Sequence, residues 1–392
     1  MKRREFIRDA AVVGTTAGLL RKSGSFIARP SSINKQEKHQ TSQQDDSDRS
    51  PNRDPMAIIE STLVVNGLDS SVLNEKYIRM LKAAQATCSH FSTDDLQSFA
   101  DLYNFLDRNS ADIFVARTVK EIWRARMQGK IALVLGWQSA QPLNLNPERP
   151  MSGPPKTPLR AYHELGLRIS MFTYNVANMF AGGNLDHDTQ IGLTNAGRRL
   201  VEEFHKLRII ADIGGHSSEK AAFDAIEMST GVPVICSHTN VKALNDNVRC
   251  ISNPLIEAIA KTGGVIGITA VNDFLVRNKS NSNLPITPPA TLDKYLDQFD
   301  YVRKLIGVDY VGLGPDFVEG IGPISDDSIS QTVWPIEYYS KGPSILYVKG
   351  FENIVQLPNV VRGLIQRGWS TGEIRKILGG NWLRIYQQVW GA

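Results

Sequence analysis

Residues 207–238 read LRIIADIGGHSSEKAAFDAIEMSTGVPVICSH. Two short apolar runs, 207–213 and 232–236, flank a stretch of helical character, 218–229. Apolar runs with little polar alternation are typical of parallel strands that are covered on both faces. Each run is followed closely by a histidine, His216 after the first and His238 after the second. The stretch therefore predicts a strand–helix–strand unit with polar side chains where its strands end.

The same alternation continues along the chain. Further apolar runs lie at 61–65, 131–136, 167–174, 264–271 and 309–314, and further helix-like stretches at 196–207 and 253–263. This order predicts a parallel α/β fold, and near-continuous apolar strands suit a barrel ringed by helices. Residues 370–390 predict a carboxy-terminal helical cap that begins with a capping box of Ser370 and Glu373. We interpret Gly379 and Gly380 within it as a helix-ending turn.

The amino-terminal segment differs from the rest in charge. Residues 1–29 hold seven Lys and Arg and two acidic residues, so they carry +5 and leave the remaining chain near −1. The overall basicity therefore gives no case for a nucleic-acid partner. Arg3 and Arg4 precede a moderately apolar stretch, 10–20, that is too short to span a bilayer comfortably. This arrangement resembles a twin-arginine export signal, with an ordinary basic amino terminus as the alternative.

These features predict three parts. We expect a twin-arginine-type signal segment at 1–29, a flexible polar linker at 30–55 and a barrel domain with its helical cap at 56–392. The signal predicts export by the twin-arginine machinery to the periplasm or cell envelope, with no transmembrane span in the mature chain. Signal cleavage stays open, and so does assembly into a homodimer.

Polar side chains follow most of the predicted strands. The residues at these positions are Leu68 and Ser70, Gln138, Tyr174 and Asn175, His216, Ser237 and His238, and Asp316. All of them except Leu68 are polar. In a (β/α)8 barrel the loops after the strands converge on one opening. Two neutral imidazoles and a carboxylate are ligands that suit zinc. The residues alone leave two interpretations open: a metal site of His216, His238 and Asp316, or hydrogen-bonded structural residues.

Three segments carry a family resemblance. They are GLTNAGRRLVEEFHKLRIIADIGGHSSEKAAFDAIEMSTGVPVICSHTN (192–240), DYVGLGPDF (309–317) and STGEIRKILGGNWLRI (370–385). Over residues 56–392 the chain resembles the membrane (renal) dipeptidases, which are zinc metallopeptidases. The resemblance implies a (β/α)8 TIM-like barrel of the metal-dependent hydrolase type, acting on dipeptides or small peptide-like amides. The sequence TYN at 173–175 resembles that of the family branch that carries Tyr, and not His, at position 174.

The resemblance also implies roles for single residues. His216 and His238 match two histidines that hold one of the family's two zinc ions. Asp316 matches an aspartate that binds or adjoins the other ion and manages the proton of the attacking water. Arg249 matches an arginine that binds the substrate or its tetrahedral intermediate, and Tyr174 belongs to the substrate pocket. The simpler alternatives are a surface cation for Arg249 and a turn cap for Asp316.

The sequence departs from the family at three positions. The family's first strand ends in His-x-Asp, where this chain has Leu68 and Ser70. Asp69 does not replace them, because neighbouring residues of a strand point to opposite faces. The family's bridging Glu matches Gln138, whose amide oxygen brings no negative charge. A paired-metal site as the family builds it is therefore not expected.

Two hypotheses follow from this departure. In the first, the chain is a hydrolase with one zinc ion, held by His216, His238 and Asp316, or by the two histidines and Gln138 if Asp316 is the base. One extra residue between Asp212 and His216, compared with the family's usual Asp-x-Ser-His, leaves the direction of His216 open. In the second, the site holds no metal, and the chain binds a small molecule or catalyses a different step without peptidase activity.

Overall fold

Parallel strands form the centre of the molecule. The computed structural model describes residues 48–143, 156–186, 189–276, 289–320 and 347–391. The predicted signal segment and most of the linker lie outside these residues. Within them the strands are β1 (Val65–Asp69), β2 (Cys88–Thr93), β3 (Ile113–Val115), β4 (Ile131–Trp137), β5 (Leu167–Ser170), β6 (Ile210–Ala211), β7 (Cys236–Thr239), β8 (Ile266–Ile268) and β9 (Val311–Leu313).

Pairing of these strands closes a barrel. One sheet runs β1-β2-β4-β5-β6 and the other β7-β8-β9, and all the pairs are parallel. Parallel bridges between Asp212 and Ile235 and between Asp69 and Phe317 join the two sheets at both of their edges. The short strand β3 pairs with the first half of β4 and stands outside this circuit. The predicted (β/α)8 barrel of TIM type is therefore confirmed.

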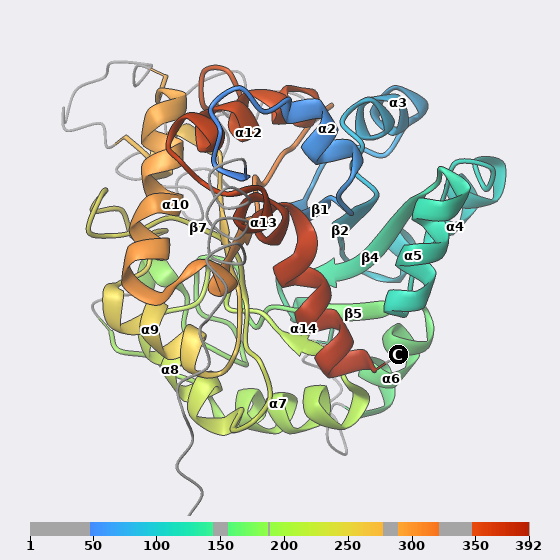
Figure 1. Ribbon diagram of the computed structural model, residues 1–392. Helices are drawn as coiled ribbons and strands as arrows, with labels where there is room; N and C mark the ends of the chain where they lie inside the picture. The colour runs from blue at the N-terminus through green and yellow to red at the C-terminus, as the bar shows by residue number, and fades with distance from the viewer. Residues whose placement is uncertain (1–47, 144–155, 187–188, 277–288, 321–346, 392) are drawn as a thin grey trace, which may run out of the picture. The chain divides into compact units, whose positions relative to one another are not determined.

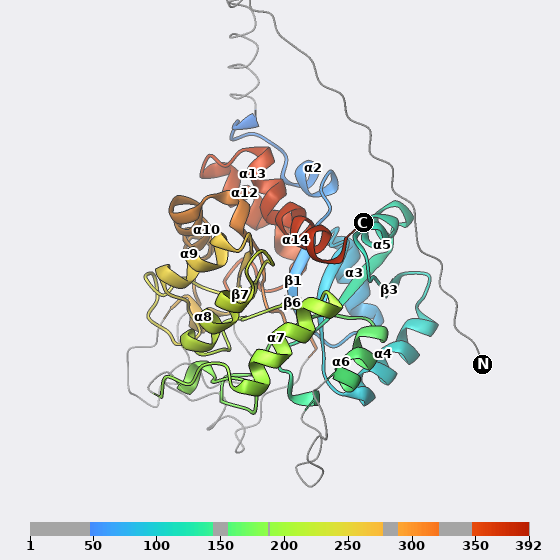
Figure 2. The same ribbon diagram turned by 90° about the horizontal axis from the view of Figure 1, so that it is seen from below.

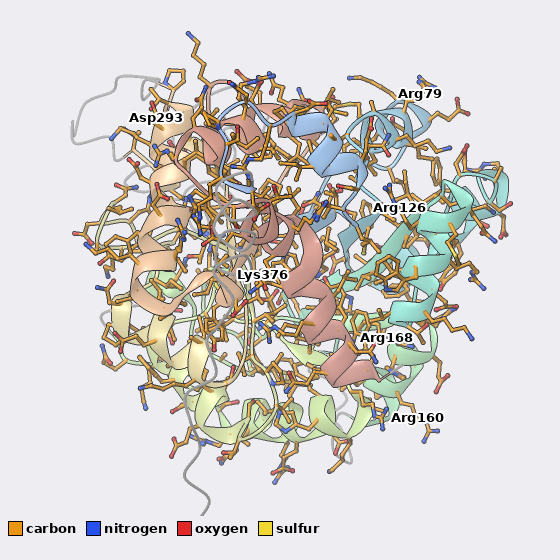
Figure 3. The ribbon with its side chains drawn as sticks, in the orientation of Figure 1. Arg79, Arg126, Arg160, Arg168, Asp293 and Lys376 are labelled. Atoms are coloured by element: carbon orange, nitrogen blue, oxygen red, sulfur yellow. The ribbon has the colours of Figure 1, made fainter. Side chains whose placement is uncertain are left out.

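Helices surround the strands in both views of the ribbon (Figures 1 and 2). They are α2 (Pro55–Glu60), α3 (Glu75–Ala83), α4 (Leu96–Arg108), α5 (Val119–Gln128), α6 (Lys156–Glu164), α7 (Asn195–Leu207), α8 (Glu219–Met228), α9 (Asn253–Lys261), α10 (Leu292–Ile306), α12 (Leu357–Gln366), α13 (Thr371–Arg375) and α14 (Asn381–Trp390). Charged side chains such as Arg79 on α3 and Asp293 on α10 point outward from this ring (Figure 3). No helix in the described ranges is both long and apolar enough to cross a membrane.

Two groups of buried side chains make the core. The larger group lies between the outer face of the strands and the helices. The second gathers Val65, Cys88, Ala132, Val134, Ile169, Ile210, Ile235 and Val265, from strands or residues beside them around the whole barrel, with Trp382 and Tyr386 of α14. Most of these residues lie at or just before the amino ends of their strands, so α14 closes that end of the barrel interior. The carboxyl ends are left for a site.

The carboxy-terminal cap agrees with the sequence at its start and differs further on. Ser370 and Glu373 form the predicted capping box, with Glu373 N donating to Ser370 Oγ and Ser370 N to the Glu373 carboxylate. The predicted helix end at Gly379 and Gly380 is wrong, because a π-helical turn, η6 (Lys376–Gly380), leads directly into α14. A Cβ atom on Gly379 would lie 1.9 Å from the Leu63 carbonyl oxygen. This glycine therefore serves close packing of the cap against the strands.

Contacts with the folded domain begin before its predicted start at Met56. Arg53 donates to the Trp369 carbonyl at 2.6 Å and to Thr371 Oγ1 at 2.9 Å. Asp54 then caps α2 by accepting from Met56 N. These contacts tie the last residues of the predicted linker to the helical cap.

Candidate active site

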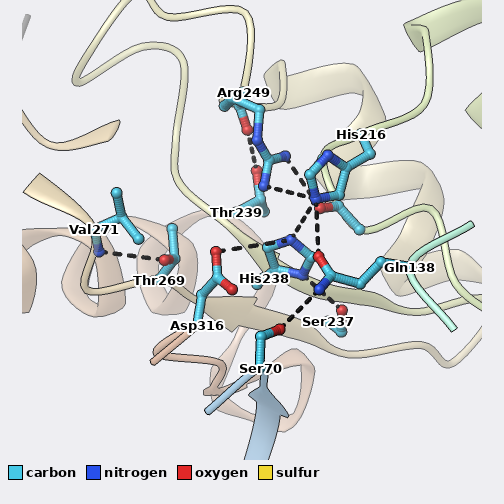
Figure 4. A network of polar contacts seen from close by, with 12 residues as sticks. Ser70, Gln138, His216, Ser237, His238, Thr239, Arg249, Thr269, Val271 and Asp316 are labelled. Atoms are coloured by element: carbon cyan, nitrogen blue, oxygen red, sulfur yellow. Dashed lines mark hydrogen bonds and ion pairs between the residues drawn. The ribbon is translucent and has the colours of Figure 1, made fainter. Parts of the chain in front are cut away.

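Side chains from several loops and strand ends meet at the carboxyl end of the barrel (Figure 4). Gln138 follows β4, His216 follows β6, His238 lies in β7 and Asp316 follows β9. Arg249 reaches the same place from the loop between β7 and α9. The structure thus brings together residues that are distant in the sequence and that were predicted to act together.

A bulge in β7 directs His238. The pairing of β7 with β8 shifts register between Cys236 and Thr239. The Ser237 carbonyl oxygen lies only 1.9 and 2.0 Å from where Cβ atoms would stand on Gly267 and Gly314. Gly267 in β8 and Gly314, directly after β9, therefore make room for the bulge, which re-aims the following side chain as bulges beside active sites do. His238 is fully buried, and its Nδ1 lies 2.9 Å from Ser237 Oγ.

A glycine turn directs His216. Gly214 and Gly215 have φ values of +37° and +72°, which residues with a Cβ atom rarely adopt. Asp212 Oδ1 accepts from Gly214 N at 2.8 Å and from Ser237 N at 2.9 Å, so one carboxylate joins the two loops that carry the histidines. The turn absorbs the extra residue noted in the sequence, and His216 points into the site.

The two imidazoles face each other. Their Nε2 atoms lie 2.9 Å apart, and the ring centroids 4.9 Å apart. Burial, together with the nearby Arg249 cation, lowers the pKa of both His216 and His238 well below the ordinary value. Both rings are therefore neutral at physiological pH, the state in which imidazole ligates metals.

Arg249 is buried rather than exposed, which excludes the surface-cation alternative. Its side chain packs over the Phe274 ring, with 4.8 Å from the guanidinium carbon to the ring centroid. Nη1 donates to the Gly214 carbonyl and Nη2 to His216 Nε2, each at 3.2 Å. A guanidinium held in this way presents positive charge inside the mouth of the barrel.

Asp316 faces the imidazole pair without touching it. Its Oδ2 lies 4.0 Å from His238 Nε2, and its side chain is 16% exposed. Burial raises the pKa of this carboxyl to about 7, against a smaller lowering by Arg249. The backbone of Asp316 has φ of +62°, and the Tyr347 hydroxyl donates to its carbonyl at 2.7 Å. A carboxyl with this pKa can take up or release a proton near neutrality.

The three substituted positions form a neutral corner. Gln138 Nε2 donates to Ser70 Oγ at 2.7 Å and to Ser92 Oγ at 3.3 Å, and Gln138 Oε1 lies 3.2 Å from His216 Nε2. Leu68 is fully buried and offers no ligand atom. Asp69 turns away, as predicted: its carboxylate accepts from Ser89 Oγ and from the Tyr77 hydroxyl of α3, outside the barrel.

The donor atoms do not fit a pair of metal ions. The corner of Leu68, Ser70 and Gln138 carries no charge, and two adjacent cations need carboxylates between them. The atoms fit one ion at the imidazole pair, because both Nε2 atoms converge while each Nδ1 is hydrogen-bonded, as in ligand histidines. No three His, Cys, Asp or Glu side chains of the described ranges gather closely enough to hold a metal. The distance of 4.0 Å between Asp316 Oδ2 and His238 Nε2 therefore favours a role for Asp316 as the base and not as a metal ligand.

Sequence reasoning had placed Tyr174 in the substrate pocket and had assigned no role to its neighbour. The Tyr174 ring stacks on the His216 ring with centroids 4.0 Å apart. Asn175 Oδ1 lies 2.7 Å from His216 Nδ1. Ser92 was missed because the polar sequence of β2 gives no apolar run that would announce a strand. The sequence signal for Asn175 was its position beside Tyr174 at the end of a predicted strand.

Comparisons with known proteins find related sequences over most of the chain. A family model described as membrane dipeptidase (peptidase family M19) matches residues 73–332 and 343–391. Dipeptidase tcpJ of Claviceps purpurea is 26% identical over 344 residues, which are 86% of this chain and 71% of the relative. Mouse Dipeptidase 3 is 27% identical over 236 residues, and the match covers 59% of this chain and 41% of that protein.

A solved structure shows the same fold. The crystal structure of an amidohydrolase from Pseudomonas aeruginosa superposes with a TM-score of 0.72 at 23% identity, covering 87% of this chain and 100% of that one. At this identity the likeness concerns the fold, and the chemistry of the site has to be argued from its own residues.

Proposed function

The chain belongs to the membrane dipeptidase family, peptidase family M19, and on that premise we propose that it hydrolyses dipeptides or small peptide-like amides with one metal ion instead of two. The observation that supports this proposal most directly is the pair of neutral imidazoles with Nε2 atoms 2.9 Å apart. Zinc is the metal that this ligand type and the family favour. A divalent cation bound there lowers the pKa of a water molecule and polarises a carbonyl oxygen.

The remaining residues supply binding and proton transfer in this proposal. Asp316, with its pKa raised to about 7, accepts a proton from the nucleophile and returns it to the leaving amine. Arg249 offers a buried cation to a carboxylate or to a developing oxyanion. Tyr174 holds the His216 ring by stacking and lines the substrate side of it.

A second candidate function rests on the neutral corner. The Ser70–Gln138 hydrogen bond joins two uncharged side chains where the family needs charged ligands. A protein with this corner can keep Arg249 and Tyr174 for binding a small molecule and lack peptidase activity. Metal content separates this candidate from the first.

The test combines metal analysis with activity. Elemental analysis of the purified protein, equilibrated with zinc and then desalted, should give close to one zinc per chain for the wild type and none for His238→Ala. The wild type should hydrolyse members of a dipeptide panel, and His238→Ala should lose that activity. The triple variant Leu68→His, Ser70→Asp, Gln138→Glu serves as a control for the scaffold and should bind a second ion. No metal and no turnover in the wild type would favour the binding protein.

We include export in the proposal. The pair Arg3 and Arg4 ahead of a short apolar stretch supports a twin-arginine route to the periplasm or cell envelope. Fractionation of cells that express the wild type and the double variant Arg3→Lys, Arg4→Lys tests it. The variant should stay in the cytoplasm, and an unchanged distribution would count against this route.

A further inference from the structure

One loop holds His216 from several sides. The loop between β5 and α7 contributes the Tyr174 ring, stacked on the imidazole, and Asn175 Oδ1, 2.7 Å from its Nδ1. The same loop contributes Asn184, whose backbone N donates to the His216 carbonyl and whose Nδ2 donates to the Gly215 carbonyl, both at 2.8 Å. Asn184 thus fixes the backbone beside His216, whereas Asn175 meets the ring itself.

The backbone at Asn175 is held in an unusual conformation for this contact. Its φ is +60°, in the left-handed region that non-glycine residues rarely occupy and that Asn tolerates best. The residue is fully buried, and a Cβ atom on Gly183 would lie 2.1 Å from the Asn175 carbonyl oxygen. Gly183 therefore leaves room for Asn175, and the loop keeps a costly backbone conformation that places one amide oxygen against one ring nitrogen.

This contact bears on which ring nitrogen of His216 carries the proton. An amide oxygen accepts, so the contact with Asn175 Oδ1 at 2.7 Å pairs with a proton on His216 Nδ1 and leaves the lone pair on Nε2. The competing acceptor on the Nε2 side, Gln138 Oε1, lies farther away, at 3.2 Å. The lone pair is directed at the site, where Arg249 Nη2 donates to it at 3.2 Å. We propose that Asn175 is a positioning residue that sets the tautomer of His216 and so keeps Nε2 available as an acceptor or ligand. The inference deepens the proposed function but depends on it only for the metal, because the tautomer is a property of the protein alone.

The experiment measures the tautomer directly. The full chain is labelled with ¹⁵N-histidine, and the His216 ring nitrogens are assigned by comparison with His216→Gln. Four proteins are compared: the wild type, Asn175→Gly, Asn175→Asp and Asn184→Ala. Glycine suits the positive φ and removes the acceptor, whereas aspartate keeps an acceptor at the same place. Asn184→Ala is the matched control, because it removes a buried asparagine contact of the same loop without touching the ring.

The expected result is a protonated Nδ1 and an unprotonated Nε2 in the wild type and in Asn184→Ala. Asn175→Gly should lose this preference and show an Nε2-protonated or mixed ring. Asn175→Asp should keep the Nδ1 proton and move its resonance downfield, because a carboxylate is the stronger acceptor. The zinc dissociation constant, measured against a chelator, should rise 10–100-fold in Asn175→Gly and recover in Asn175→Asp.

Three results would overturn the inference: a wild-type ring protonated at Nε2, an unchanged tautomer in folded Asn175→Gly, or an equal shift in Asn184→Ala. If Asn175→Gly does not fold, the test rests on Asn175→Asp. An Nδ1–H resonance of His216 that is the same in Asn175→Asp as in the wild type would then overturn the inference. Absence of zinc binding in the wild type would contradict the proposed function while the ring signals still decide the role of Asn175.

Discussion

At the scale of single residues, Asp212 connects the two histidine loops. One carboxylate oxygen accepts from the backbone of both loops, and the other, Oδ2, has no hydrogen-bond partner among the described residues. Burial raises the pKa of Asp212 from its ordinary 3.8 to about 6, although its hydrogen bonds act in the opposite direction. The charged form is thus costly in the folded protein, and the residue remains because its acceptor joins the loops.

This balance predicts a pH-dependent stability. Between pH 3.8 and about 6 the folded protein keeps a proton that the unfolded chain has released, so the stabilisation from Asp212 is complete below that window and is lost as pH rises through it. The loss amounts to about 3 kcal/mol at 1.36 kcal/mol per pKa unit. Asp212→Asn keeps one oxygen acceptor without the charge. Its free energy of unfolding, relative to wild type, should therefore rise by up to about 3 kcal/mol between pH 4 and pH 7 in urea titrations.

The control for this prediction is Asp293→Asn, since Asp293 has a side chain that is 84% exposed. Its effect should stay within about 0.5 kcal/mol at both pH values. A pH-independent difference between Asp212→Asn and wild type would contradict the assignment of the cost to a buried charge.

At the scale of elements, most of the apolar strands were found from the sequence, whereas the three-residue strand β3, with sequence IFV, was not predicted. The predicted runs at 131–136, 167–174 and 264–271 contain or overlap β4, β5 and β8. The strand β2, with sequence CSHFST, escaped prediction because all of its residues except Phe91 are small or polar. His90 of this strand is fully buried, with Nδ1 2.7 Å from the Gly67 carbonyl oxygen. Tertiary packing thus made a strand from a segment whose own pattern did not indicate one.

The bulge in β7 gives the prediction at this scale. In Gly267→Ala the new methyl group would meet the Ser237 carbonyl oxygen, which is part of the backbone and cannot turn away. We expect the free energy of unfolding to fall by about 1–3 kcal/mol, and more if the strand cannot shift. Zinc affinity should fall with it, because His238 follows the displaced peptide. Urea unfolding and chelator competition measure the two effects.

Gly372→Ala in α13 is the matched control. A Cβ atom there meets only Ser370 Oγ, at 3.8 Å. Alanine in a helix should leave stability unchanged or raise it by about 0.5–1 kcal/mol. If Gly267→Ala were as stable as Gly372→Ala, the close approach at the bulge would not control this part of the fold.

At the scale of the whole molecule, the last helix completes the barrel. Trp382 of α14 is fully buried, and its Nε1 donates to the Leu313 carbonyl of β9 at 3.0 Å. Gly67 in β1 and Gly312 in β9 leave room for its indole, since Cβ atoms there would lie 2.5 and 2.6 Å from it. One side chain therefore packs against the first and last strands, where the barrel closes.

Removing this side chain should weaken the whole domain. Trp382→Ala should lower the free energy of unfolding by about 3–5 kcal/mol, because it leaves a large cavity and an unpaired carbonyl. Trp123→Ala on α5 is the control, since Trp123 is 50% exposed, and should cost less than about 1 kcal/mol. Comparable losses in the two variants, measured by urea unfolding, would show that closure of the barrel does not depend on Trp382.

The parallel alternation of strands and helices, the capping box at Ser370 and most of the residues that meet at the site could be predicted from the chain alone. Each of these depends on local pattern, or on the rule that strand ends converge. Three features depend on contacts between residues distant in the sequence: the bulge that aims His238, the π-turn at Gly379 and the contact of Asn175 with His216. Each of these contacts joins a backbone carbonyl or a ring nitrogen to an atom of another strand or loop. The periodicity of the sequence reports only on neighbours along the chain, so it does not indicate such contacts.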